Sequence, residues 1–299
     1  MDTGRGITVF APAKINLYFH IVGKRNDGYH DLDSLVAFAD IGDSIRIEPA
    51  RNFHFQVDGP FAGAFTNRDL DPSLSSSNLV TRATRAIAEA FRREPHIRIT
   101  LTKNLPIASG LGGGSADAAA TLWGLMQLWQ IPPSMPLLPE LMLSLGADVP
   151  VCMHGAPVRM RGIGDILDPV PGLLDIPAIL INPLKPCVTA DIFRRLKGPV
   201  RREVAMPQDL SSEASLIEFL QQQNNDLTAA ATECVPEVAE IISLLREQKE
   251  CSLSRMSGSG ATVFGLFSCW DHALKAAEQI NANHPEWWVR AGTINRPER

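Results

Sequence analysis

Residues 106–120 read PIASGLGGGSADAAA, and they place four glycines in five positions directly before a run of alanines. The preceding residues alternate between apolar and polar types at Ile97, Ile99 and Leu101, which predicts a strand, and residues 116–129 form an apolar pattern that predicts a helix. A glycine-rich turn between a strand and a helix points successive backbone N–H groups into one concavity, where the helix dipole also favours an anion. The stretch therefore predicts a phosphate-binding loop, with a flexible loop that only caps a tightly packed helix as the alternative.

Two familiar nucleotide loops do not match this stretch. A Walker A loop needs lysine and a hydroxyl residue after its last glycine, but Gly114 is followed by Ser115, Ala116 and Asp117. A dinucleotide fingerprint that starts at Gly110 needs glycine or alanine at position 115, where the chain has serine. The loop is neither of these types.

Composition limits the classes of protein that the chain can belong to. Its 299 residues are 45% hydrophobic and 20% charged, which suits about two globular domains. A formal net charge of -5 argues against a nucleic-acid or membrane-surface binder. The five cysteines are widely spaced without a CxxC pair, and there is no long apolar leader or spanning segment. We therefore expect a cytoplasmic protein without nucleic acid or membrane as partner, and small anionic ligands stay possible. A monomer or homodimer is expected, although composition does not decide between them.

The order of predicted elements is that of an α+β protein. Strands are expected from residue 13 to 21 and at 34–39, 44–48, 53–57 and 97–101, and a helix capped by Ser77 is expected to run to residue 91. The second half predicts a strand at 178–182, helices near Leu216 and Pro236, then strand, strand, helix and strand. We expect two domains, 1–165 and 166–299.

Two polar residues stand out in these patterns. In LGADVP, we expect Gly146 to end a helix in the left-handed conformation and Pro150 to hold Val149 extended, which fixes Asp148 in a bent segment. Asp148 then acts as a helix cap or Asx turn, or as a general base. Lys14 projects from the polar face of the first strand, either as an ordinary surface lysine or as a functional cation. The glycine cluster RMSGSGATVF, residues 255–264, predicts a turn between strands or a second backbone surface near a ligand.

Together these motifs resemble the GHMP kinases, named for galactokinase, homoserine, mevalonate and phosphomevalonate kinases. The three matching stretches, in the family's order, are APAKINLYFHIVGKRNDGYHDLDSL at 11–35, LPIASGLGGGSADAAATL at 105–122 and RMSGSGATVFGLF at 255–267. They span nearly the whole chain. The resemblance implies the two-domain GHMP kinase fold, with an N-terminal domain like ribosomal protein S5 domain 2 and a ferredoxin-like C-terminal domain.

The resemblance also implies a reaction and its residues. The forms KIN, GKRNDGYHDLDSL, GLGGGSADAAA and LGADVP are similar to those of one subgroup. That subgroup transfers the γ-phosphoryl group of ATP to the 2-hydroxyl of 4-diphosphocytidyl-2-C-methyl-D-erythritol, in non-mevalonate isoprenoid biosynthesis. By position, Asp148 corresponds to the catalytic base and Lys14 to its charged partner. The positions that correspond to ATP-binding residues are Asn78, Lys103, Pro106, Ile107, Ala108, Ser109, Gly110, Leu111, Gly112, Gly113, Gly114, Ser115 and Ala116.

The acceptor site follows from the same resemblance. Tyr29 and His30 correspond to cytidine-binding residues and Phe193 to an aromatic residue on the other side of the base. Asn16 and Thr189 are further acceptor-site candidates. A pyrimidine between two aromatic rings is a reasonable way to bind a flat ligand.

The metal site and two rival functions stay open. ATP is expected as its Mg²⁺ complex, but several relatives carry serine where this loop has Gly113 and Gly114, so no metal ligand is assigned. Ser115 can reach the metal or cap the alanine helix. The rivals are a mevalonate or homoserine kinase, against which GYHDLDSL argues, and a catalytically silent nucleotide-binding protein, against which the presence of Lys14 and Asp148 argues.

Overall fold

The computed structural model describes residues 6–26, 28–71, 76–196, 200–207 and 209–295. These residues form an α+β fold with eleven strands and nine α-helices. In chain order, the elements are β1 (Ile7–Asn16), β2 (His20–Lys24), β3 (His30–Pro49), β4 (His54–Asp58), α1 (Leu79–Ala90), β5 (Ile97–Thr102), α2 (Gly113–Trp129), α3 (Leu138–Leu145), α4 (Val149–His154), β6 (Val158–Gly162), β7 (Ile166–Pro169), β8 (Ile176–Asn182), α5 (Thr189–Arg195), α6 (Glu213–Gln221), α7 (Thr228–Cys234), α8 (Glu237–Arg246), β9 (Cys251–Met256), β10 (Val263–Phe267), α9 (Trp270–Asn283) and β11 (Trp288–Ile294).

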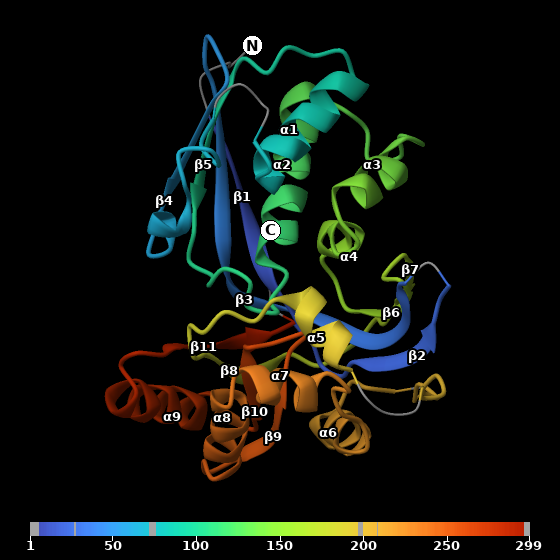
Figure 1. The fold of residues 1–299 in the computed structure, drawn as a ribbon, viewed down its shortest axis with the longest axis vertical. Helices are drawn as coiled ribbons and strands as arrows, with labels where there is room; N and C mark the ends of the chain where they lie inside the picture. The colour runs from blue at the N-terminus through green and yellow to red at the C-terminus, as the bar shows by residue number, and fades with distance from the viewer. Residues whose placement is uncertain (1–5, 27, 72–75, 197–199, 208, 296–299) are drawn as a thin grey trace.

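The long strand β3 connects the two halves of the molecule (Figure 1). We predicted two short strands at 34–39 and 44–48, but the chain continues as one strand of 20 residues. At about 3.3 Å per residue, such a strand exceeds the length of any single partner. It is therefore paired in sections: with β6 over residues 32–36, with β11 at Ala39 and with β5 over residues 44–49. On its other edge β1 pairs with it antiparallel.

The alanine-rich helix α2 packs closely on the N-terminal part of the sheet. Its residues 116–122 are buried, and helix α1 lies beside it on the same face (Figure 1). A Cβ atom at Gly124 would lie 2.5 Å from Cδ1 of Ile47, so the helix and strand approach too closely for a larger residue there. This close packing explains why the predicted helix is rich in small residues.

The C-terminal half continues the same sheet. Strands β11, β8, β10 and β9 are antiparallel neighbours in that order, and β11 joins β3 through the pairing of Ile294 with Ala39. Helices α8 and α9 cover this half (Figure 1). Strand β7 pairs with β6, so residues 166–169 belong with the N-terminal half. We propose that the domain boundary lies just after Pro169, close to the expected position 165.

Several local predictions were wrong. Gly146 has φ 164° and ψ 152°, which is extended backbone and not the left-handed region. Val149 begins helix α4 and is not extended, because proline in the first turn of a helix loses no intrahelical hydrogen bond. Helix α1 is capped by Asn78, whose side chain accepts a hydrogen bond from N of Val80 at 2.8 Å, and not by Ser77.

Candidate active site

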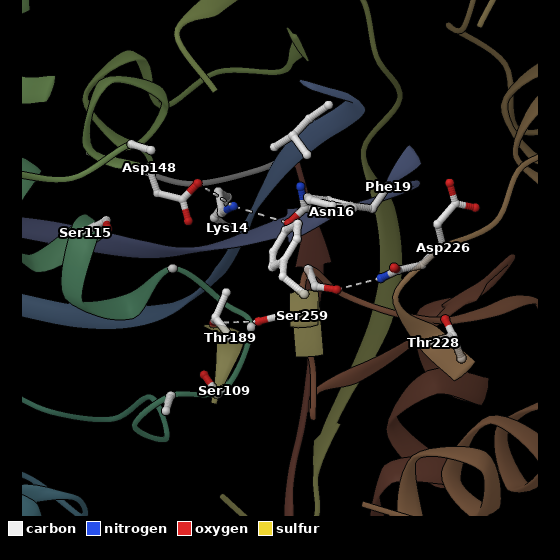
Figure 2. Close-up of a pocket in the computed structure, with 18 of the residues that line it drawn as sticks. Lys14, Asn16, Phe19, Ser109, Ser115, Asp148, Thr189, Asp226, Thr228 and Ser259 are labelled. Atoms are coloured by element: carbon white, nitrogen blue, oxygen red, sulfur yellow. Dashed lines mark hydrogen bonds and ion pairs between the residues drawn. The ribbon is translucent and has the colours of Figure 1, made fainter. Parts of the chain in front are cut away.

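A cleft of about 2490 Å³ lies where the two halves meet, and it collects residues from all three sequence motifs. Strand β1 contributes Lys14 and Asn16, the start of α2 contributes the glycine loop, and the turn between β9 and β10 contributes Gly258 and Ser259. Figure 2 shows Lys14 between Asp148 and Asn16, with Thr189 and Ser259 facing each other nearby. The volume is sufficient for two nucleotide-sized ligands.

Lys14 and Asp148 form the centre of the cleft. The Nζ atom of Lys14 lies 3.0 Å from Oδ1 of Asp148 and 3.3 Å from Oδ1 of Asn16. Lys14 is 4% exposed, so the alternative of an ordinary surface lysine is wrong. The pairing of β1 with β3 shifts register between Pro12 and Lys14, which coincides with the point where the lysine enters the cleft.

Asp148 occupies the N-cap position of α4, yet its side chain makes no capping hydrogen bond. It turns instead to Lys14, and its side chain stays 39% exposed to the cleft. The helix-cap alternative therefore does not account for this carboxylate. Its position fits a group that must meet both a cation and a ligand hydroxyl.

The glycine loop forms an anion-binding cradle at the start of α2. Gly110 and Gly112 have φ of 76° and 63°, values that favour glycine, and residues 112–115 line the cleft. Because Gly112 is the N-cap and has no side chain, no capping side chain occupies the N–H groups of the first turn. Phosphate oxygens fit these donors. Ser115 lies inside the first turn, so its predicted N-cap role is wrong, while its place in the cleft wall keeps it near a bound phosphate.

The third glycine motif packs directly against this loop. It forms the turn between β9 and β10, as predicted, and N of Thr262 donates to the carbonyl of Ser109 at 3.1 Å. Oγ of Ser257 donates to the carbonyl of Gly110 at 3.2 Å. A Cβ atom at Gly110 would lie 2.5 Å from the carbonyl oxygen of Ser257, so this close backbone contact requires glycine.

Lys103 lies in a buried ion cluster beneath the loop, which sequence reasoning did not find. Its Nζ atom is 2.6 Å from Oδ2 of Asp43 and 2.6 Å from Oδ2 of Asp117. Oδ1 of Asp43 accepts from N of Asn104 and N of Leu105. Burial raises the pKa of Asp117, whose Oδ1 is buried without a hydrogen bond among the described residues. The cluster supports the first turn of α2 from below, and no local pattern signals it because Asp43 is 60 residues from Lys103.

The predicted acceptor residues gather at the other end of the cleft. Tyr29 is 59% exposed, and the rings of His30 and Phe193 have centroids 5.4 Å apart. Phe19, which we did not single out, packs edge-on against Phe193 at 6.4 Å. Burial, and then the charge of Lys24, lower the pKa of His30, so its imidazole is neutral near pH 7. A neutral imidazole offers both a donor and an acceptor to a base edge.

Most of the remaining predicted residues line the cleft, but Leu111 and Ala116 do not, because both side chains are buried in the core. Oγ1 of Thr189 is 2.8 Å from Oγ of Ser259, which joins α5 to the third motif. Asn78 lines the cleft while its Oδ1 caps α1. Within the ranges that the structure describes, there is no group of three or more His, Cys, Asp and Glu residues that could hold a metal ion. No described helix is long and apolar enough to cross a membrane.

Comparisons with known proteins point in one direction. Residues 78–156 match the model of the GHMP kinases N terminal domain, and residues 208–286 match that of the GHMP kinases C terminal domain. The chain is 44% identical to a 4-diphosphocytidyl-2-C-methyl-D-erythritol kinase of Paramagnetospirillum magneticum, over 94% of this chain and 96% of that protein. It is 48% identical to the enzyme of the same name from Cereibacter sphaeroides, with the same two coverages.

Solved structures agree with these relatives. A crystal structure of 4-(cytidine 5'-diphospho)-2C-methyl-D-erythritol kinase has a TM-score of 0.77 and 32% identity, and the match covers 97% of this chain and 100% of that one. A homoserine kinase from Cytophaga hutchinsonii has a TM-score of 0.71 at 20% identity, with 98% and 96% covered. The second likeness supports the fold alone.

Proposed function

The chain belongs to the GHMP kinases, and within them to the 4-diphosphocytidyl-2-C-methyl-D-erythritol kinases; from this premise we propose how its residues carry out the reaction. The enzyme transfers the γ-phosphoryl group of ATP to the 2-hydroxyl of 4-diphosphocytidyl-2-C-methyl-D-erythritol, a step of non-mevalonate isoprenoid biosynthesis. The observation that carries the residue assignment is the contact of 3.0 Å between Lys14 and Asp148 in a cleft that also holds the glycine loop.

Asp148 is the general base in this proposal. Its carboxylate is exposed to the cleft and is not used for capping, so it can accept the proton of the acceptor hydroxyl. The ammonium of Lys14 lies beside it and stabilises negative charge that develops on the transferred group. Oδ1 of Asn16 accepts a second hydrogen bond from that ammonium and helps to hold it in place.

Residues 112–115 would hold the phosphates of ATP through the free N–H groups at the start of α2. We also propose Asn78 and Lys103 as nucleotide contacts. The contacts of the Lys103 ammonium with Asp43 and Asp117 support an indirect role, in which Lys103 holds the loop in place. Mg²⁺ would be bound mainly by the phosphates of ATP and by water, as it commonly is in kinase sites. When bound, it neutralises phosphate charge and orients the transferred group.

The acceptor's cytosine fits between Tyr29 and the ring of Phe193, with His30 at its edge. Tyr29 is exposed and can cover a flat ligand, while Phe193 is fixed by its contact with Phe19. Thr189 and Asn16 belong to the lining of the same cleft and are the further proposed acceptor contacts. We further propose a cytoplasmic location, because all five cysteines are free thiols and two of them are buried in the core.

The decisive experiment compares acceptors at saturating Mg·ATP. Initial rates of ADP release are measured with the cytidylyl substrate, its uridylyl analogue, 2-C-methylerythritol 4-phosphate, homoserine and mevalonate. We expect only the cytidylyl substrate to be used efficiently, since a site that hydrogen-bonds one base rejects the other strongly. Comparable kcat/KM for the free sugar phosphate, or for homoserine or mevalonate, would contradict the acceptor assignment and leave the family unchanged.

A further inference from the structure

The buried hydroxyl of Ser34 is separated from the catalytic pair by one intervening side chain, that of Asn16. Ser34 is on β3 and has no exposed surface. Its Oγ atom is 2.6 Å from the carbonyl oxygen of Tyr18 and 2.8 Å from Nδ2 of Asn16. Asn16 in turn contacts Lys14, so Ser34 is connected to the cleft through a single side chain.

The carbonyl group of Tyr18 determines the donor and the acceptor of each hydrogen bond in this series. The carbonyl oxygen of Tyr18 can only accept, so the one proton of the Ser34 hydroxyl is committed to it. The Ser34 oxygen is then left as an acceptor for Asn16, and only the amide nitrogen of Asn16 can donate to it. The amide is therefore held with Oδ1 on the opposite side, where it accepts from Nζ of Lys14 at 3.3 Å.

The opposite orientation of the Asn16 amide would place two N–H groups against an ammonium. Among the described residues, Lys14 donates to Oδ1 of Asn16 and Oδ1 of Asp148, and that arrangement replaces the first of these acceptors with a repulsive contact. The backbone of Asn16 is held independently, since its N donates at 3.1 Å to Oγ of Ser257, which donates to Gly110. Ser34 thus controls the orientation of the amide, while Ser257 controls the position of the strand.

We propose that Ser34 is a positioning residue that sets the orientation of the Asn16 amide and, through it, aims the Lys14 ammonium at Asp148. The inference rests on the proposed function of Lys14 and Asp148. A purely structural Ser34 would instead support the turn between β1 and β2 through Tyr18, with no dependence on Asn16.

A double-mutant cycle separates these two roles. We expect Ser34→Ala to lower kcat about tenfold and to change the KM for ATP less than twofold. In an Asn16→Ala background the same substitution should change kcat less than twofold, because residues that act through one another are not additive. An equal loss of kcat in both backgrounds would overturn the proposal. Ser34→Thr, which keeps the hydroxyl, should restore kcat to within threefold of the original enzyme if the extra methyl group is accommodated.

Thr84→Val is the matched control for lost stability. Oγ1 of Thr84 is also fully buried and donates to a backbone carbonyl, that of Val80 at 2.9 Å, but it lies in α1 away from Asn16. We expect it to lower the melting temperature about as much as Ser34→Ala while kcat stays normal. If Thr84→Val lowers kcat equally, the loss of activity in Ser34→Ala reflects stability and the proposal fails.

A second measurement does not depend on the substrate. Hydrogen exchange of the Asn16 side-chain amide, identified by its absence from the spectrum of Asn16→Ala, should be slow in the original protein and at least tenfold faster in Ser34→Ala. Unchanged exchange would show that Ser34 does not hold the amide. If the original enzyme does not phosphorylate the cytidylyl substrate but the exchange difference appears, the proposed function is wrong, while the role of Ser34 in orienting the Asn16 amide is confirmed.

Discussion

Replacing Asp148 by asparagine should remove catalysis while leaving the fold intact. The substitution keeps the shape of the side chain and an oxygen that can accept from Lys14 at 3.0 Å. It removes the ability to take a proton from the acceptor hydroxyl. Since the side chain makes no capping hydrogen bond, no helix cap is lost either.

The structure sets the size of both effects. Loss of a general base lowers turnover by about 10²- to 10⁴-fold, equivalent to roughly 3–5 kcal/mol of barrier. The side chain of Asp148 is 39% exposed, so water screens its ion pair and we expect the pair to contribute at most about 1 kcal/mol to stability. That loss corresponds to a fall of a few degrees in melting temperature for a protein of this size.

The assay combines steady-state kinetics with thermal unfolding. We expect kcat to fall by the factor above, the KM for ATP to stay within about threefold, and the melting temperature to fall by only a few degrees. Asp168→Asn is the matched control, because Asp168 is a half-exposed carboxylate that pairs with Arg161 at 2.8 Å outside the cleft. Turnover of Asp148→Asn within fivefold of normal, or equal losses in both variants, would refute the assignment of the base.

Three further predictions test the other parts of the cleft. Phe193→Ala and Tyr29→Ala should each raise the KM for the acceptor about ten- to a hundredfold, as expected from the free energy of stacking a base on an aromatic ring, without changing the KM for ATP. Tyr29 is 59% exposed, so Tyr29→Ala should keep full thermal stability. Gly114→Ala, where a Cβ meets only Cδ1 of Leu79 at 3.3 Å, should keep the melting temperature but weaken ATP binding about tenfold in calorimetry. Burial raises the pKa of Asp117 above its ordinary value of 3.8, so the native state keeps a proton that the unfolded chain releases. The free energy of unfolding therefore falls as pH rises above 3.8. In urea unfolding, the fall in this free energy between pH 5 and pH 8 should be smaller for Asp117→Asn than for the original protein.

Elements with a regular pattern could be predicted from the sequence. The alternation at 97–101 reports the burial of one face of β5, which is a local property, and the alanine-rich pattern predicted the buried helix α2. The half-buried strand expected from residue 13 to 21 was wrong. β1 ends at Asn16, β2 begins at His20, and residues 13–21 are buried on both faces because the second half of the chain packs over them. Helix α4 was missed because a six-residue helix that contains proline carries little periodic signal. The long β3 was divided in the prediction because residues 40–43 include two aspartates and a glycine. In the structure β1 pairs with Gly42 and Asp43, while β11 and β5 pair with the flanking Ala39 and Ser44, and these partners keep the strand continuous.

Side-chain contacts across the site depend on the tertiary fold. Lys14 and Asp148 are 134 residues apart, and only the resemblance to a family linked them before the structure placed them at 3.0 Å. Lys103 was expected at the nucleotide, but no sequence pattern links it to Asp43 and Asp117. The hydroxyl of Ser34 was missed for the same reason, since a serine in a strand has no pattern of its own.

The glycine loop depends on the second half of the chain for its shape. The carbonyl oxygens of Ser109 and Gly110 accept hydrogen bonds from Thr262 and Ser257, and the approach of the two backbones excludes any Cβ at Gly110. Because these contacts come from the turn between β9 and β10, the N-terminal half alone lacks the partners that hold the loop in place. The same Ser257 also anchors the backbone of Asn16, next to the catalytic lysine. The nucleotide cradle and the catalytic pair therefore share one support, and both reach their final geometry only when the two halves are packed together.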